Sequence, residues 1–82
     1  MSEKMILERA DLAKQIVRDA KGVGIPAGSA KMMADQIAEK VIGWAKKRST
    51  ITEADLDRQL AKVAKKYSDD LAYVYENRDK II

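Results

Sequence analysis

The amino-acid sequence contains no cysteine and no histidine. Without cysteine, the chain forms no disulfide and offers no thiolate to a metal or a substrate. Without histidine, it lacks the commonest protein ligand of metals and the side chain that most often acts as a general base near neutral pH. No spacing among its acids, lysines and hydroxyls pairs a nucleophile with a base. The sequence therefore predicts neither a catalytic site nor a metal site, and we expect a protein that is not an enzyme.

Long apolar runs are also missing from the sequence. No stretch reaches the roughly 18 consecutive apolar residues that a transmembrane helix needs. Residues 1–14 carry acidic charge and lack the apolar core of a secretory signal peptide. The sequence therefore predicts no membrane contact, and we expect a cytoplasmic protein.

The residues that are present are typical of a small folded protein. Of the 82 residues, 46% are apolar and 35% are charged, and we expect one domain over residues 1–82. The net charge is +3, but the segment 29–48 carries +3 and the segment 67–82 carries −2. A dedicated nucleic-acid binder more often has one concentrated basic face, so this distribution gives such a function little support.

Apolar residues recur every three to four positions nearly throughout the chain, which is the spacing of an α-helix. No stretch alternates with the period of two that a strand requires. The predicted fold is therefore all-α, a compact bundle of four helices with short loops. The expected helices cover residues 4–21, 29–47, 53–66 and 69–80.

Local signals mark the ends of these predicted helices. Gly22 is expected to end the first helix in the left-handed conformation that glycine adopts easily. Ser29 is expected to cap the second helix with its hydroxyl. Thr52, with Asp55 three residues later, predicts a capping box at the start of the third helix, and Ser68 predicts a cap on the fourth.

Each predicted helix has an apolar face that we expect to turn inward. In the first helix this face consists of Ile6, Ala10, Ala13, Val17 and Ala20, widened by Leu12 and Ile16. In the second it consists of Met33, Ile37, Val41 and Trp44, with Ala34, Ala38, Ile42 and Ala45 beside them. In the third and fourth it consists of Leu56, Leu60, Val63 and Ala64, and of Leu71, Val74 and Tyr75.

Residues 22–31, GVGIPAGSAK, have a composition that binds phosphate in other proteins. A P-loop needs the spacing G-x-x-x-x-G-K-[ST] between a strand and a helix, but counting from Gly22 places Ala27 where the second glycine should stand. The glycines are also one residue too far apart for a dinucleotide-binding fingerprint, and a predicted helix precedes them. We therefore interpret the segment as the connection between the first two helices.

A run of basic residues follows the second predicted helix. Cations at the end of a helix stabilise its negative pole, and this role alone is sufficient to explain them. The functional alternative is that they bind the phosphate of a nucleotide or of a nucleic acid, together with further lysines across the turn. Glu53, Asp55 and Asp57 lie near the same turn, and their negative charge weakens the binding of a phosphate there. The candidate residues are Lys46, Lys47, Arg48, Lys62, Lys65 and Lys66.

Aromatic and acidic side chains suggest two further contacts. Trp44 shares the apolar stripe of its helix, so we expect it to pack in the core, with base stacking as the alternative. Tyr73 lies off the apolar face of the fourth helix and is the candidate for an exposed ring that stacks on a base or binds a partner. Asp69 and Asp70 are expected to stabilise a helix start, with Mg²⁺ ligation alongside a nucleotide as the alternative.

The closing segment LAYVYENR, residues 71–78, and the order of the predicted helices resemble the helical part of an ATP-cone. This domain occurs in ribonucleotide reductases and in the repressor of their genes. The resemblance covers residues 10–80 and implies a regulatory or interaction module that binds an adenine nucleotide, ATP or dATP, or a protein partner. The matching positions are Ala72, Val74, Tyr75 and Arg78. The N-terminal hairpin that carries the basic phosphate-binding motif of ATP-cones has no counterpart before Ile6.

A second resemblance gives a different function. The segment KRSTITEADL, residues 47–56, is similar to the basic loop and third-helix start of archaeal histones, which wrap DNA as dimers. The central helix of that fold is longer than the predicted helix 29–47 by more than about two turns. The alternative function is therefore a small DNA-binding protein, histone-like or helix-turn-helix-like, that uses the basic turn at 46–48. In either case, a chain this small is expected to leave apolar surface exposed, which predicts a protein partner or self-association.

Overall fold

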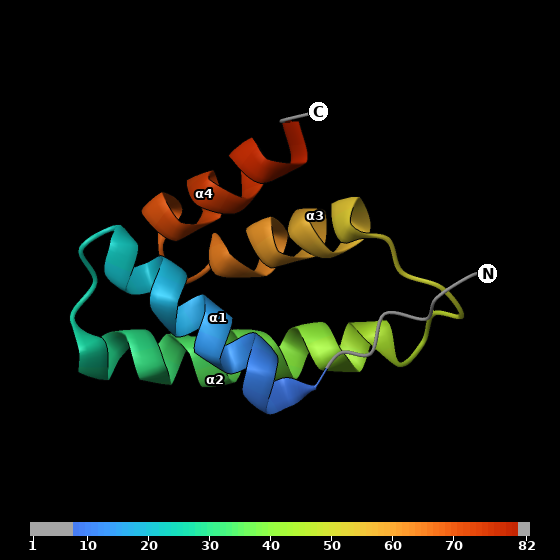
Figure 1. Ribbon diagram of the computed structural model, residues 1–82, viewed down its shortest axis with the longest axis horizontal. Helices are drawn as coiled ribbons and strands as arrows, with labels where there is room; N and C mark the ends of the chain where they lie inside the picture. Colours follow the sequence, from blue (N-terminus) through green and yellow to red (C-terminus); the bar gives the residue numbers. More distant parts are fainter. Residues whose placement is uncertain (1–7, 81–82) are drawn as a thin grey trace.

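The regular spacing of apolar side chains produces a fold made only of helices. The structure, a computed structural model, describes residues 8–80, and within that range it contains four α-helices and no strand (Figure 1). The helices are α1 (Arg9–Gly22), α2 (Ala27–Ala45), α3 (Glu53–Ala64) and α4 (Asp69–Lys80). The predicted all-α bundle of four helices is therefore confirmed.

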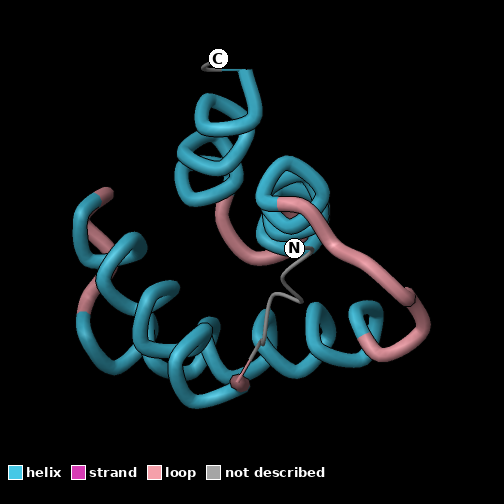
Figure 2. The backbone as a smooth tube through the Cα atoms, turned by 45° about the vertical axis from the view of Figure 1, so that its right-hand side comes forward, coloured by secondary structure: helices cyan, strands magenta, loops and turns pink. Residues whose placement is uncertain are grey.

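The four helices form two antiparallel hairpins. Helices α1 and α2 pack against each other along their length, and so do α3 and α4. Helix α3 lies across α2, and α1 meets α4 over a shorter stretch. Figures 1 and 2 show the α1–α2 hairpin below the α3–α4 hairpin, so that α2 and α4 form opposite edges of the bundle. The molecule measures 40 × 26 × 19 Å.

The core lies between the two hairpins and is rich in alanine. Small side chains let helix axes approach closely. Ala30, Ala34 and Ala38 are fully buried along α2, and Ala20 and Ala64 are buried on α1 and α3. The larger buried side chains are Leu12, Ile16, Ile37, Val41, Leu60, Val63, Leu71 and Tyr75.

The predicted inner faces are largely confirmed, with corrections in α1 and in α4, where Ala72 is buried and the expected Val74 is only partly buried. In α1, the stripe that faces the core is Leu12, Ile16 and Ala20, whereas Ala10 is exposed on the flank of the helix. Several expected positions are partly buried and pack against the core: Ala13, Val17, Met33, Ile42, Trp44 and Leu56. The expected contribution of Ile6 lies outside the described residues. Helix α1 begins only at Arg9 because Glu8 has extended backbone angles.

The glycine-rich segment forms the turn between α1 and α2, as interpreted. The Ile25 N–H donates to the Ala20 carbonyl and the Gly24 N–H to the Lys21 carbonyl, both at 3.1 Å, which is the pattern of a Schellman motif. The left-handed residue of this motif is Gly24, with φ at +89°, so the prediction that Gly22 takes this role is wrong. Helix α1 ends at Gly22, one residue beyond the predicted end at residue 21. The position that needs a left-handed conformation, and therefore glycine, is Gly24.

The cap predicted for α2 is also wrong, whereas those of α3 and α4 are confirmed. Pro26 is the N-cap of α2, and its carbonyl accepts from the Ala30 N–H at 2.8 Å, so Ser29 already lies inside the helix. At α3, the Asp55 N–H donates to Thr52 Oγ1 at 3.1 Å and the Thr52 N–H to Asp55 Oδ2 at 3.4 Å. At α4, the Leu71 N–H donates to Ser68 Oγ at 3.2 Å.

Candidate functional site

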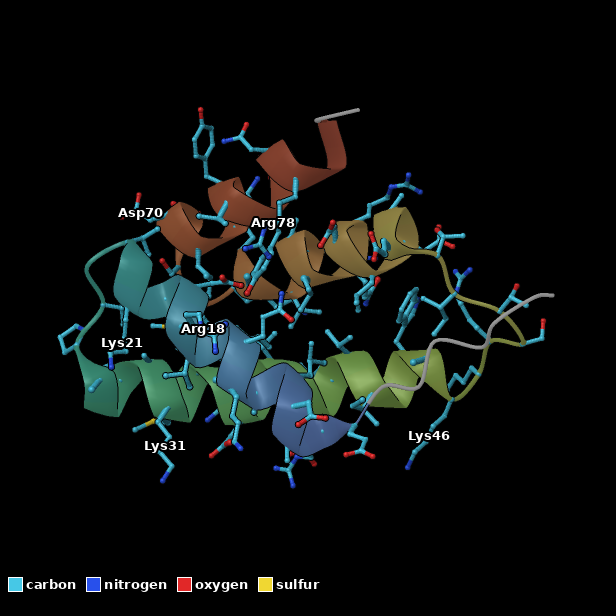
Figure 3. The ribbon with its side chains drawn as sticks, viewed as in Figure 1. Arg18, Lys21, Lys31, Lys46, Asp70 and Arg78 are labelled. Carbon is cyan, nitrogen blue, oxygen red and sulfur yellow. The ribbon has the colours of Figure 1, made fainter. Side chains whose placement is uncertain are left out.

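The end of α2 and the segment that follows it form a surface that we call the basic corner. It consists of Trp44, Lys46, Lys47, Arg48, Ser49 and Thr50. Helix α2 ends at Ala45, and the next residues continue its winding for most of a turn: the Lys46 N–H donates to the Ile42 carbonyl at 3.0 Å and the Arg48 N–H to the Ala45 carbonyl at 3.0 Å. This backbone geometry spreads three successive cations around the helix end. Figure 3 shows the Lys46 side chain pointing away from the bundle.

The charges of the basic corner are not neutralised. Lys46, Lys47 and Arg48 are all exposed, and none of them has an ion-pair partner among residues 8–80. Arg48 stacks on the Trp44 ring, with its guanidinium carbon 4.9 Å from the ring centroid. Trp44 itself is partly buried and packs against the core, which agrees with the predicted packing role. The corner therefore presents three cations supported by one anchored aromatic ring.

Asp55 is the acidic residue whose charge interacts with Arg48 of this corner, and its side chain already takes part in the capping box of α3. Hydrogen bonding to Thr52, first to its backbone and then to its side chain, holds the pKa of Asp55 below its usual value. The charges of Arg58 and Arg48 lower the pKa of Asp55 further. Asp55 is thus an ionised carboxylate engaged in the capping box, and its charge partly offsets that of Arg48.

Five of the six residues of the basic corner line an open hollow. Trp44, Lys47, Arg48, Ser49 and Thr50 line a volume of about 570 Å³. Pockets that bind small molecules commonly measure about 300–1,000 Å³, so the hollow is large enough for a nucleotide, although it is shallow. Lysine and arginine can neutralise a phosphate, the hydroxyls can donate hydrogen bonds to it, and the indole edge can contact a base. The arrangement favours binding of an anion that carries a flat apolar group.

The other predicted cations do not join this corner. Lys62 lies in the last turn of α3, and Lys65 and Lys66 follow the helix. Helix α3 has 12 residues, and a rise of about 1.5 Å per residue places Lys62 about 14 Å and Lys65 about 18 Å along the helix axis from its first residue, Glu53, which follows the basic corner in the chain. The expectation that all six cations meet across one turn is therefore corrected, because the length of α3 keeps the two groups apart.

Tyr75 and Arg78, which match the ATP-cone pattern, form an internal cluster with Asp19 that we call the Asp19 cluster. The Tyr75 hydroxyl donates to Asp19 Oδ2 at 3.0 Å. Arg78 donates from Nη2 to Oδ1 at 2.9 Å and from Nη1 to Oδ2 at 3.3 Å, so it grips both carboxylate oxygens. Figure 3 shows Arg78 reaching from α4 toward α1. The cluster ties the last turns of α1 to α4.

Burial and charge both act on the titration of the Asp19 cluster. Burial raises the pKa of Tyr75 strongly, and the charge of Asp19 and the hydrogen bond to it raise it further. Burial alone lowers the pKa of Arg78, but the hydrogen bond and the charge of Asp19 outweigh it and leave that pKa raised. Tyr75 is fully buried, so it is not an exposed ring. Both side chains therefore hold α4 against α1.

Asp19 is the residue of this cluster that sequence reasoning missed. It stands between the buried positions Ile16 and Ala20, on the flank of the inner face, and nothing local distinguishes it from other acids of the chain. The remaining candidates lie on the surface of α4. Tyr73 is 63% exposed, and Asp69 and Asp70 are exposed in the first turn of α4. Within the described range, no group of three or more acids could hold a metal ion.

The chain matches no protein-family model, no curated protein and no solved structure. The resemblances to ATP-cones and to archaeal histones therefore stay predictions. Of the helices between residues 8 and 80, none combines the length and the hydropathy that a membrane-spanning segment requires.

Proposed function

We propose that this protein is a non-enzymatic binding module and that its basic corner binds the phosphates of an adenine nucleotide, ATP or dATP. The observation that carries the proposal is the combination, around one hollow, of two exposed cations without ion-pair partners, Lys47 and Arg48, and an aromatic ring anchored in the core, with the exposed Lys46 beside them in the chain. Adjacent positive charges repel one another, and a bound phosphate relieves that repulsion. Arg48 adds the planar, forked donor geometry that suits phosphate oxygens.

We assign the ligand to the basic corner and not to Tyr75 and Arg78, the residues that the ATP-cone resemblance indicates, because those two side chains already have partners. The guanidinium of Arg78 already donates to both oxygens of Asp19, and the Tyr75 ring is fully buried. Binding a phosphate at Arg78 would require that ion pair to break. The hollow at the basic corner is open, so we expect modest affinity, with a dissociation constant on the order of 0.1–1 mM, or about 4–5.5 kcal/mol.

The test uses Trp44, the one tryptophan of the chain, as an internal reporter. Titration with ATP should change its fluorescence and saturate in the millimolar range. The double variant Lys47→Ala/Arg48→Ala should weaken binding at least about tenfold, since it removes two phosphate partners. The matched control Lys65→Ala/Lys66→Ala removes the same charge at the far end of α3 and should bind like the wild type. Equal affinity in the two double variants would contradict the proposal.

A DNA duplex is the second candidate ligand, because the cations of the corner protrude from an open surface that a phosphate backbone can approach. In that case the affinity should fall steeply with salt, with a log–log slope of about −0.9 for each phosphate neutralised. Lys47→Ala/Arg48→Ala should then reduce the slope by about two units. Saturable binding of duplex DNA without a Trp44 response to ATP would favour this candidate over the nucleotide.

A further inference from the structure

Two large apolar side chains stand exposed among the described residues. Met32 on α2 is 65% exposed and Tyr73 on α4 is 63% exposed, while the other large apolar side chains in that range are at least partly covered. Exposed apolar surface on a small protein often marks a site of contact with another molecule. The two side chains belong to helices at opposite edges of the bundle, with α4 above and α2 below (Figure 1). The two side chains therefore do not cover each other within one molecule.

Met32 borders a hollow that is suited to a single large side chain. This Met32 hollow is lined by Ser29, Met32, Met33, Gln36 and Tyr67 and has a volume of about 200 Å³. Methionine side chains are flexible and polarisable, and they adapt to an inserted group. The hollow can therefore close around one aromatic ring.

The surroundings of the Met32 hollow are basic. Lys40 lies over the Tyr67 ring, with its Nζ 5.2 Å from the ring centroid. Lys65 and Lys66, both exposed, immediately precede Tyr67 in the turn between α3 and α4. Of the acids of α2, Glu39 is paired with Arg9 at 4.0 Å, whereas Asp35, three residues after Met32, is exposed and offsets one of these three cations. A group that enters the hollow is favoured if it carries negative charge around it.

Tyr73 has the opposite surroundings. Asp69 and Asp70 precede it by four and three residues and Glu76 follows it by three, so these carboxylates are its neighbours on the outer side of α4. None of the three has an ion-pair partner in the described part of the chain. We call this surface the Tyr73 face. It consists of one exposed aromatic ring within a group of three unpaired negative charges.

We propose that the Tyr73 face and the Met32 hollow are the two halves of a contact between copies of this chain. The Tyr73 ring of one copy enters the Met32 hollow of another, and Asp69, Asp70 and Glu76 lie near the lysines around it. Shape supports this match because an exposed aromatic ring enters an apolar hollow. Charge supports it because the carboxylates around the ring come close to the lysines around the hollow. Figure 3 shows Asp70 at the start of α4 and Lys31 below it on α2, at the same end of the bundle but on its upper and lower sides. The contact is small, so the association is weak and reversible.

The first test measures molecular mass by sedimentation from about 10 µM to about 1 mM protein. The mass of the wild type should rise with concentration, and less so at high salt. Met32→Glu and Tyr73→Ala should each weaken association at least about tenfold. Met32→Leu and Tyr73→Phe, which keep the apolar groups, should associate like the wild type. A wild type that stays monomeric throughout, or a Tyr73→Ala variant that associates normally, would overturn the proposal.

The second test mixes the two defective variants. The Met32→Glu protein keeps an intact Tyr73 face, and the Tyr73→Ala protein keeps an intact Met32 hollow. One contact can form in the mixture, so the mass should rise although neither variant associates alone. A mixture that stays monomeric would contradict the pairing of these two surfaces. Both substitutions fall on exposed side chains, and unchanged helical circular dichroism verifies that each variant is folded.

A control variant separates this contact from the proposed nucleotide site. Lys47→Ala/Arg48→Ala alters the basic corner at the other end of α3 and should leave self-association unchanged. Met32→Glu should in turn leave the Trp44 response to ATP unchanged. Loss of self-association in Lys47→Ala/Arg48→Ala would contradict the proposed surfaces, whether or not ATP binds.

Discussion

The Asp19 cluster and the basic corner handle charge in opposite ways. In the Asp19 cluster, Arg78 and Tyr75 share the oxygens of one carboxylate, and the side chain of Asp19 is only 10% exposed. In the basic corner, three cations follow one another in the chain and stand in solvent without a partner in residues 8–80. The comparison teaches that paired charge near the core contributes to folding, whereas unpaired surface charge is available to a ligand.

The largest effect should come from breaking the pair in the Asp19 cluster. Asp19→Ala leaves the Arg78 charge and the buried Tyr75 hydroxyl without their acceptor. Removing one partner of a buried pair costs about 3–5 kcal/mol, and the 37% exposure of Arg78 reduces our expectation to about 2–3 kcal/mol. Urea unfolding followed by circular dichroism measures the change. Asp35→Ala, at an exposed position of α2, should change stability by less than about 0.5 kcal/mol.

A smaller effect is expected from high pH acting on the same cluster. The pKa of Tyr75 is raised in the folded protein, so the unfolded chain loses its tyrosine proton first. Tyr75 therefore contributes this stabilisation below its unfolded pKa of about 10, and the contribution is lost as the pH rises above that value. The loss should reach about 1.4 kcal/mol at pH 11. The measurement is the free energy of unfolding of the wild type and of Tyr75→Phe at pH 9 and pH 11. The decrease between the two pH values should be smaller in Tyr75→Phe by about 1.4 kcal/mol. The same decrease in both proteins would contradict the account.

A local cap should contribute less than the long-range cluster. Thr52→Ala removes the hydroxyl that accepts from the Asp55 N–H at the start of α3, and should destabilise the protein by about 1 kcal/mol. The same box lowers the pKa of Asp55 in the folded protein, so this group stabilises the fold at neutral pH. That contribution is lost as the pH falls below the unfolded pKa of Asp55 and through its lower folded pKa. Thermal unfolding gives both results. Thr50→Ala, in the preceding segment, is the control and should have little effect.

Sequence reasoning located the features that depend on neighbouring residues. The helices, the capping box at Thr52 and the Ser68 cap follow from spacings of three or four positions, which a single sequence displays directly. The choice between Gly22 and Gly24 as the left-handed residue depends on where α1 ends to within one residue, and helix ends are set by packing as well as by local signals.

Long-range features could not be predicted in the same way. Asp19 lies 56 residues from Tyr75 and 59 from Arg78, and nothing in the helical spacing shows that the end of α1 meets α4. The positions of the candidate lysines could not be predicted either. The sequence does not show the direction in which α3 runs, and this direction places Lys62 and Lys65 at a different end of the bundle from Lys47. The pattern of a helix indicates its buried face, but it does not indicate which helix covers that face.

The most direct test of the contrast between paired and unpaired charge is an amide chemical-shift map of the wild-type protein titrated with ATP. The account predicts that the largest shifts occur at Trp44 and residues 46–50, while Asp19, Tyr75 and Arg78 keep their positions. Saturable shifts centred on the ends of α1 and α4, with the basic corner unchanged, would show that the paired charges bind the ligand and would contradict the account.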